Sequence, residues 1–99
     1  MRAYRDRLRA RFQRTVLNLT KAWEMNGNAK KAEALYHQCL ERDASAEIIY
    51  RQLMLHLKVR GRHAEALDVY RRCETALLSS LATRPSPETR LVYKSLRGT

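Results

Sequence analysis

The sequence predicts an all-α protein made of antiparallel helical hairpins, with two repeats plus a C-terminal capping helix. Large apolar residues stand three and four positions apart along most of the 99-residue chain, which is the spacing of one face of a helix. No segment alternates apolar and polar residues as a half-buried strand does. Five residues also return in the same order 34 positions later: Leu19, Gly27, Ala32, Tyr36 and Cys39 recur as Leu53, Gly61, Ala66, Tyr70 and Cys73.

The period of 34 residues is the length of a helix-turn-helix unit of the tetratricopeptide kind. Each copy supplies large residues on a first helix, a glycine that permits a left-handed turn, and an alanine that lets two helix backbones approach. We predict a single tetratricopeptide-like domain over residues 1–99, with repeat units at about 13–46 and 47–80 and a cap at about 86–97. The pattern positions are filled by Val16, Leu19, Trp23, Ala32 and Tyr36 in one copy and by Tyr50, Leu53, Leu57, Ala66 and Tyr70 in the other.

Two features depart from the tetratricopeptide pattern. The usual small residue after the first leucine is Thr20 in one copy and Met54 in the other, which we expect to loosen the inner contact of each unit. Neither copy closes with the expected proline, which suggests that the final helix of the second unit continues past the usual end.

The apolar spacing and the residues that interrupt it predict five helices, all antiparallel neighbours. Their expected extents are a long first helix that ends near Met25, then about 29–42, from about Ser45 to Gly61, about 62–81, and a short last helix after Pro85. The first helix should bury one face, which is formed by Leu8, Phe12, Val16, Leu19 and Trp23.

Capping residues predict where two of these helices begin. Ser45 is the expected N-cap of the third helix, and Glu47 suits the positive end of that helix. Ser86 and Pro87 are the expected N-cap and first-turn proline of the last helix. We expect this last helix to cover the apolar edge that the second unit leaves exposed, as stacked repeats require at their ends.

Length and composition exclude several classes of protein. A chain of 99 residues fits one domain with one core. No apolar run approaches the roughly 20 residues that span a bilayer, and the arginine-rich start lacks the apolar core of a secretion signal. These features predict a cytoplasmic protein with no membrane partner. Cys39 and Cys73 occupy the same position in the two units, so packed thiols are favoured over a disulfide or a ligand pair.

Positive charge is concentrated at the start of the chain. Lysines and arginines exceed acidic residues by twenty to ten, and the first 14 residues hold six arginines and one aspartate. A nucleic-acid partner is one explanation, but we favour a solvated, arginine-rich helix face, because few aromatic residues that could stack on bases lie among the arginines. Nucleic-acid contact should be weak and nonspecific, since the arginines alternate around the helix without forming one stripe with Asn or Gln. The residues available to contact phosphate are Arg2, Arg5, Arg7, Arg9, Arg11 and Arg14.

The second half of the chain contains four distinctive segments, residues 50–54, 61–67, 70–73 and 85–93. The last of them begins Pro-Ser-Pro-Glu-Thr-Arg, a string that ordinary tetratricopeptide units lack. With these segments the sequence resembles the bacterial transcriptional activator domain, a tetratricopeptide-like module found beside a winged-helix DNA reader in antibiotic-pathway regulators and in some signalling proteins. The resemblance covers nearly the whole chain and is most specific over residues 47–96.

This resemblance implies protein contacts, self-association or regulation of an adjoining DNA reader, and it carries over no catalytic residue. In the family the DNA reader precedes the module. An all-helical chain that begins with Met1 directly in a helix leaves no room for a winged helix. We therefore expect an excised C-terminal module in preference to a short stand-alone protein.

No group of residues predicts an enzyme or a metal site. His37, His56 and His63 do not pair with other ligand residues at a recognised spacing, so solvated or partly packed histidines are expected. Ser79 and Ser80 have no histidine and acid partner nearby in the sequence, and no glycine-rich phosphate loop is present. We expect no catalytic residue, no metal and no cofactor.

The first helices of stacked units line a concave face, so residues there that lie off the buried face are the binding candidates. Leu55 is the most informative of them, because it lies among polar and cationic neighbours, and such a surface suits an acidic, partly apolar peptide. The alternative is that Leu55 packs on the preceding unit. The predicted protein-binding groove consists of Asn18, Lys21, Met25, Arg51, Gln52, Leu55 and Lys58.

The sequence thus predicts a helical scaffold that mediates protein association in bacterial transcriptional regulation or signalling. Its expected partner is a protein or an acidic peptide segment, either of the parent protein or of a second copy. Two alternatives remain open, a basic nucleic-acid-binding module and a stand-alone homodimerisation domain. Light scattering detects the dimer, and an electrophoretic shift that weakens as salt rises detects phosphate binding.

Overall fold

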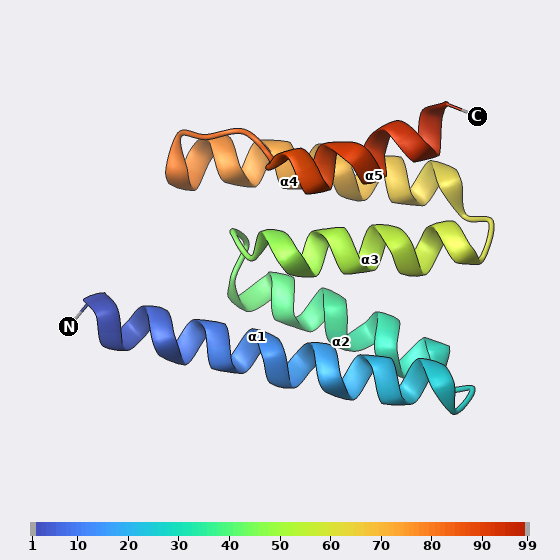
Figure 1. Ribbon diagram of the computed structural model, residues 1–99, viewed down its shortest axis with the longest axis horizontal. Coiled ribbons are helices and arrows are strands. Elements are labelled where there is room, and N and C mark those ends of the chain that lie inside the picture. Colours follow the sequence, from blue (N-terminus) through green and yellow to red (C-terminus); the bar gives the residue numbers. More distant parts are fainter. Residues whose placement is uncertain (1, 99) are drawn as a thin grey trace.

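The computed structural model describes residues 2–98 and consists of five α-helices joined by short connections (Figure 1). α1 and α2 form one antiparallel hairpin, α3 and α4 form a second hairpin stacked beside it, and α5 packs against α3 and α4 (Figure 1). The described residues contain no strand, so the predicted all-α hairpin fold is confirmed. The helices are α1 (Arg2–Met25), α2 (Ala29–Arg42), α3 (Glu47–Val59), α4 (His63–Leu81) and α5 (Pro87–Arg97).

α3 is the central helix of the stack. It packs against α1 and α2 on one side and against α4 and α5 on the other. Six of its 13 residues are buried, so nearly half of the helix belongs to the core. Each fully buried aliphatic side chain contributes about 1.5–3 kcal/mol relative to an exposed one. The buried residues of α3 are Ile49, Tyr50, Leu53, Met54, His56 and Leu57.

The two hairpins turn in the same way. Gly27 and Gly61 have φ values of +81° and +75°, and a Cβ atom on either glycine would meet no other atom within 4 Å. Glycine is therefore favoured here by the left-handed backbone conformation, and not by a lack of room for a side chain. The next amide closes the helix end in both copies: Asn28 N donates to Trp23 O at 2.7 Å, and Arg62 N donates to Leu57 O at 2.9 Å. These are Schellman motifs, which end α1 and α3 where the sequence predicts.

The start of α5 agrees with the sequence prediction. Ser86 is the N-cap, its Oγ accepts a hydrogen bond from Thr89 N, and Pro87 lies in the first turn. α4 runs on to Leu81, as the absence of a closing proline suggests.

The predicted cap of α3 is wrong. Its N-cap is Ala46, which makes no side-chain hydrogen bond. The hydroxyl of Ser45 instead donates to Asp43 Oδ1 at 3.0 Å and accepts from Arg9 Nη2 at 3.1 Å. The Ser45 hydroxyl is thus engaged in a long-range contact with α1 and does not cap α3.

The predicted buried face of α1 is only partly correct. Val16 is buried and Trp23 packs against the core, but Leu8, Phe12 and Leu19 are exposed. Leu19 is 39% exposed, whereas Leu53, its equivalent in the second repeat, is 0% exposed. α3 has the first hairpin on that side, whereas no described helix covers the corresponding side of α1. The repeated sequence therefore does not produce repeated burial.

The small-residue positions of both units lie inside the core. Thr20 and Met54 are both fully buried, and the Thr20 hydroxyl donates to Leu17 O at 3.1 Å. Both side chains are accommodated inside the core, and the expected loosening of the inner contact stays a prediction. Cys39 and Cys73 are free, buried thiols, as predicted, and burial raises the pKa of both, to about 12 for Cys73.

Tyr70 provides a test of the core. Its buried ring stacks on Tyr93 of α5, with ring centroids 4.1 Å apart and planes inclined by 14°. Because Tyr70→Ala leaves a cavity and removes this stacking, we expect the free energy of unfolding in urea to fall by about 3–5 kcal/mol. Tyr4→Ala is the control and should cost under about 0.5 kcal/mol, since Tyr4 is exposed. Equal losses for the two variants would show that α5 does not pack on Tyr70.

Candidate protein-binding groove

A groove of about 370 Å³ lies between the C-terminal halves of α1 and α3. Four of the seven predicted groove residues line it together: Lys21 and Met25 from α1, with Gln52 and Leu55 from α3. Leu55 is half-buried and borders the open space. The two helices thus present apolar and cationic side chains to one cavity.

The two rims of the groove are built from equivalent positions of the repeat. Lys21 corresponds to Leu55, and Met25 corresponds to Val59, each pair being separated by 34 residues. Met25 is 78% exposed and Val59 is 80% exposed, although both are apolar. α1 and α3 run in the same direction (Figure 1). Met25 and Val59 both line the cavity between these helices. The groove is therefore a product of the repeat itself.

Three predicted groove residues do not line this cavity. Asn18 is exposed on α1. Arg51 Nη1 donates to Thr89 Oγ1 at 3.3 Å and lies 3.6 Å from a carboxylate oxygen of Glu88. Lys58 Nζ donates to Ser95 Oγ at 2.9 Å. These contacts direct Arg51 and Lys58 toward α5, so both cations hold the last helix.

Sequence reasoning missed four residues of the lining. Val59 could have been found as the repeat equivalent of Met25, which was in the predicted set. The other three residues gave no sequence signal, because their positions depend on contacts between helices. They are Glu24, His56 and Arg60.

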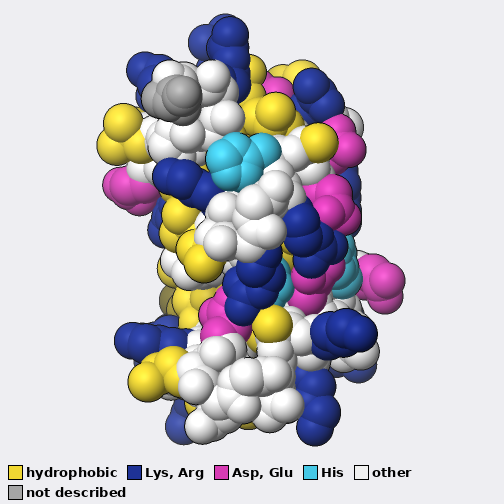
Figure 2. All heavy atoms as spheres, turned by 90° about the vertical axis from the view of Figure 1, so that its right-hand side faces the viewer, with side chains coloured by type: hydrophobic (Ala, Val, Ile, Leu, Met, Phe, Trp, Pro, Cys, Tyr) yellow, Lys and Arg dark blue, Asp and Glu magenta, His cyan; other side chains and the backbone are white. Residues whose placement is uncertain are grey.

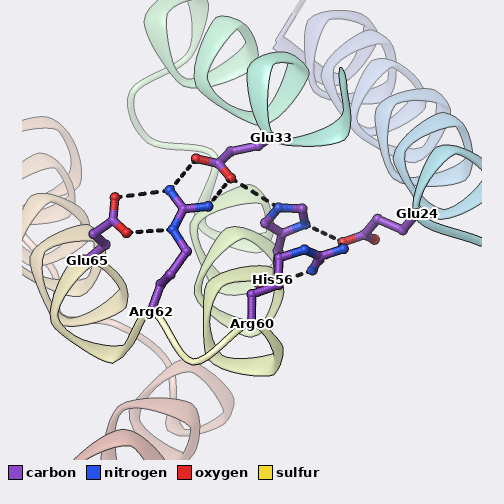
Figure 3. A network of polar contacts seen from close by, with 6 residues as sticks. All are labelled: Glu24, Glu33, His56, Arg60, Arg62 and Glu65. Atoms are coloured by element: carbon purple, nitrogen blue, oxygen red, sulfur yellow. Dashed lines mark hydrogen bonds and ion pairs between the residues drawn. The ribbon is translucent and has the colours of Figure 1, made fainter. Parts of the chain in front are cut away.

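A group of charged side chains forms one wall of the groove and extends to the neighbouring turn (Figure 3). Glu33 of α2 accepts two hydrogen bonds from Arg62, at 2.6 and 2.8 Å, and lies 3.2 Å from His56 Nε2. The other ring nitrogen of His56, Nδ1, is hydrogen-bonded to Glu24 of α1. Arg62 also donates to Glu65 of α4 at 2.5 and 3.0 Å. Four helices therefore meet in this charged network.

Electrostatics favours the ionised form of this network. The hydrogen bonds from Arg62 lower the pKa of Glu33, and His56 adds to this effect while burial opposes it. Both ring nitrogens of His56 face carboxylates, Nδ1 toward Glu24 and Nε2 toward Glu33. Arg60 Nη1 donates to His56 O at 2.9 Å and lies 3.7 Å from Glu24. Figure 2 shows basic and acidic side chains side by side on this face of the molecule.

The prediction that all three histidines are solvated or partly packed is wrong for His56. Its side chain is buried and its ring packs edge-on against Tyr36, with centroids 5.7 Å apart. Glu33, which the sequence places one helical turn before His37, pairs with His56 and Arg62 instead. Within residues 2–98 no cluster of three or more His, Cys, Asp and Glu side chains has the arrangement of a metal site.

Several arginines of α1 lie on one side of the helix. Because α1 is one continuous helix, Arg7, Arg11 and Arg14 share one side with Asn18 and Lys21 at spacings of four and three. The sequence was expected to spread all six arginines around the helix without one stripe that includes Asn or Gln, whereas three of the six share a side with Asn18. Phosphate contact by these arginines stays a prediction.

The other predicted phosphate contacts differ in their surroundings. Arg9 forms a bidentate pair with Asp43, with its shortest bond at 2.8 Å, and is therefore already engaged. Burial acts to raise the pKa of Asp43, but hydrogen bonds from Arg9 and Ser45 outweigh it and lower the pKa. The side chain of Arg2 lies outside the described part of the chain. Arg5 is exposed on α1.

The Pro-Ser-Pro-Glu-Thr-Arg string joins α5 to the start of α3. Glu47 accepts hydrogen bonds from Ser86 N at 2.7 Å and from the hydroxyl of Thr89 at 2.6 Å. Thr89 is fully buried. Burial raises the pKa of Glu47, but the bonds from Thr89 and Ser86 outweigh this and lower it. The string thus specifies both the helix cap and the docking of α5.

These features define a helical repeat module with a capping helix and a groove between its repeats. The family model of the bacterial transcriptional activator domain matches residues 1–97, and the chain belongs to that family, as the resemblance predicts. The family is a regulatory domain of bacterial transcriptional activators and is not a family of enzymes. The comparisons with curated proteins and with solved structures found no significant match. None of the described helices combines the length and apolar character needed to cross a membrane.

Glu33 gives a pH-dependent test of the charged network. Because the pKa of Glu33 is lower in the folded than in the unfolded chain, its ionised form stabilises the fold. This stabilisation is complete above the ordinary carboxyl range, near pH 4.3, and is lost as the pH falls through the lower folded value. Glu33→Gln should therefore cost about 1–2 kcal/mol at neutral pH in urea unfolding, and should lose less stability than the wild type on acidification.

The matched control is Glu65→Gln, which removes the more exposed of the two carboxylates on Arg62. We expect a much smaller loss from this change, because solvent screens exposed pairs. Equal pH profiles for the wild type and Glu33→Gln would contradict the role given to Glu33.

Proposed function

We propose that this module contributes to a bacterial transcriptional regulator by binding a protein segment in the groove between α1 and α3. The observation that carries the proposal is the high exposure of two equivalent apolar side chains, Met25 and Val59, around one cavity. An apolar cavity rim on a folded protein favours contact with another apolar surface. Membership of a regulatory family supports a binding role.

The charges around the groove favour an acidic partner segment. Lys21 and Arg60 line the cavity, and the one carboxylate there, Glu24, is hydrogen-bonded to His56. Lys21 forms no ion pair with a carboxylate in the part of the chain that the structure describes. An acidic peptide with one or two large apolar side chains therefore complements the groove in both charge and polarity.

The groove also provides rigid walls. The bond between His56 and Glu24 links α3 to α1 directly beside the cavity. A wall that is ordered before binding lowers the entropic cost of association. The partner segment, in contrast, can be extended or helical, because the groove offers side-chain contacts and no free strand edge.

Selection from a random peptide library tests this function with a defined probe. We expect the enriched peptides to combine Asp or Glu with Leu, Phe or other large apolar residues. Met25→Asp with Val59→Asp should weaken their binding at least tenfold, or about 1.4 kcal/mol, in fluorescence anisotropy. Lys21→Glu should weaken the same peptides, because it reverses the charge at the rim.

Leu91→Asp is the matched control, since Leu91 is also an exposed apolar residue, at 64%, but lies on α5. This variant should bind the selected peptides like the wild type, and all variants should keep the helical circular dichroism spectrum. Selected peptides that bind the groove variant as tightly as the wild type would contradict the proposal. Substituting Arg51 and Lys58 is unsuitable here, because both side chains hold α5.

A further inference from the structure

A second exposed surface lies on α1, on the outer side of the stack. Its apolar side chains follow one another along one side of the helix and are between 39% and 65% exposed. From the first to the last they extend over about 22 Å of the helix axis. In Figure 1 the N-terminal part of α1 extends past the ends of α2 and α3. We name this surface the α1 stripe, and it consists of Tyr4, Leu8, Phe12 and Leu19.

The internal repeat identifies what such a surface normally contacts. Leu19 is equivalent to Leu53, which is fully buried, and the helix that carries Leu53, α3, packs against both helices of the first hairpin. The neighbouring His56 on the same side of α3 contacts Tyr36 and Glu33 of α2. Leu19, the last residue of the α1 stripe, therefore corresponds to a side of α3 that is covered by a helix. Tyr4, Leu8 and Phe12 precede the repeat and continue the same side of α1 toward its N-terminal end.

Charge indicates the chemistry of the occupant. Arg7, Arg11 and Arg14 form a row along one side of the stripe, and Arg5 lies on the other side. None of these four arginines forms an ion pair with a carboxylate among the described residues. A helix with an apolar face flanked by Asp or Glu matches this arrangement in both respects.

We propose that the α1 stripe docks an acidic amphipathic helix supplied by a partner protein. A second copy of the chain is disfavoured, because pairing two α1 helices brings their arginine rows together. A lipid bilayer is disfavoured because the apolar side chains cover only a narrow strip of the helix. This site is separate from the groove, whose lining begins at Lys21.

The test uses a designed helical peptide of about 16 residues, with leucines at i, i+3 and i+7 spacings and flanking glutamates. We expect the protein to bind it with a dissociation constant in the micromolar range, measured by fluorescence anisotropy. A matched peptide with lysine in place of glutamate should bind at least tenfold more weakly. Leu8→Ser with Phe12→Ser should weaken binding of the acidic peptide at least tenfold.

Because the proposed groove also suits acidic, apolar peptides, the parent protein for these measurements is the groove variant, Met25→Asp with Val59→Asp, which separates this proposal from the proposed function. Arg7, Arg11 and Arg14 changed to Gln in this parent should weaken binding without changing the helix content. Equal binding by the parent with and without the Leu8/Phe12 substitutions, or no micromolar binding by the parent, would overturn the proposal. A dimer in sedimentation that the Leu8/Phe12 variant abolishes would assign the stripe to a second copy. Binding to phosphatidylglycerol vesicles in place of the peptide would assign it to a membrane.

Discussion

The charged network centred on Glu33 fixes the position of the two hairpins relative to each other. α1 and α3 are not adjacent in the chain, and the bond between Glu24 and His56 connects them beside the groove. Glu33 and Arg62 add the connection from α2 to the turn that follows α3. Removing one partner destabilises the network, because the remaining partly buried polar groups lose their hydrogen bonds. The shape of the groove therefore depends on this network remaining intact.

The repeat produces two surfaces of different character from one pattern. Where a position of the first unit meets the second, equivalent side chains such as Met25 and Val59 form opposite rims of one cavity. Where no described helix covers the pattern, Leu19 is exposed, although its equivalent Leu53 is fully buried. The central helix α3 has neighbouring helices on both sides, so its apolar side is covered, whereas the equivalent side of α1 is exposed. Both proposed binding surfaces follow from this difference between the middle and the end of the stack.

Much of the fold was predictable because it depends on local chemistry. The helix extents, the glycine turns and the Ser86 cap follow from periodicity and from residues that fix their own backbone. The errors concern long-range partners. The Ser45 hydroxyl is hydrogen-bonded to Arg9 and Asp43 and does not cap α3, and Arg51 is hydrogen-bonded to Thr89 of α5. Residue spacing along the chain does not reveal these long-range contacts. Half of the groove was found because the repeat specifies which positions face the concave side, whereas its charged wall depends on contacts among four helices.

The most direct measurement is the distance between the two rims of the groove. Spin labels on Met25→Cys and Val59→Cys are well placed for pulsed electron paramagnetic resonance, because both positions are exposed and the native thiols Cys39 and Cys73 are buried. A network that locks the hairpins together predicts one narrow distance distribution, which a bound peptide leaves nearly unchanged. Glu33→Gln should broaden it. A broad or two-peaked distribution in the otherwise unchanged protein would show that the hairpins move independently and that the groove is not preformed.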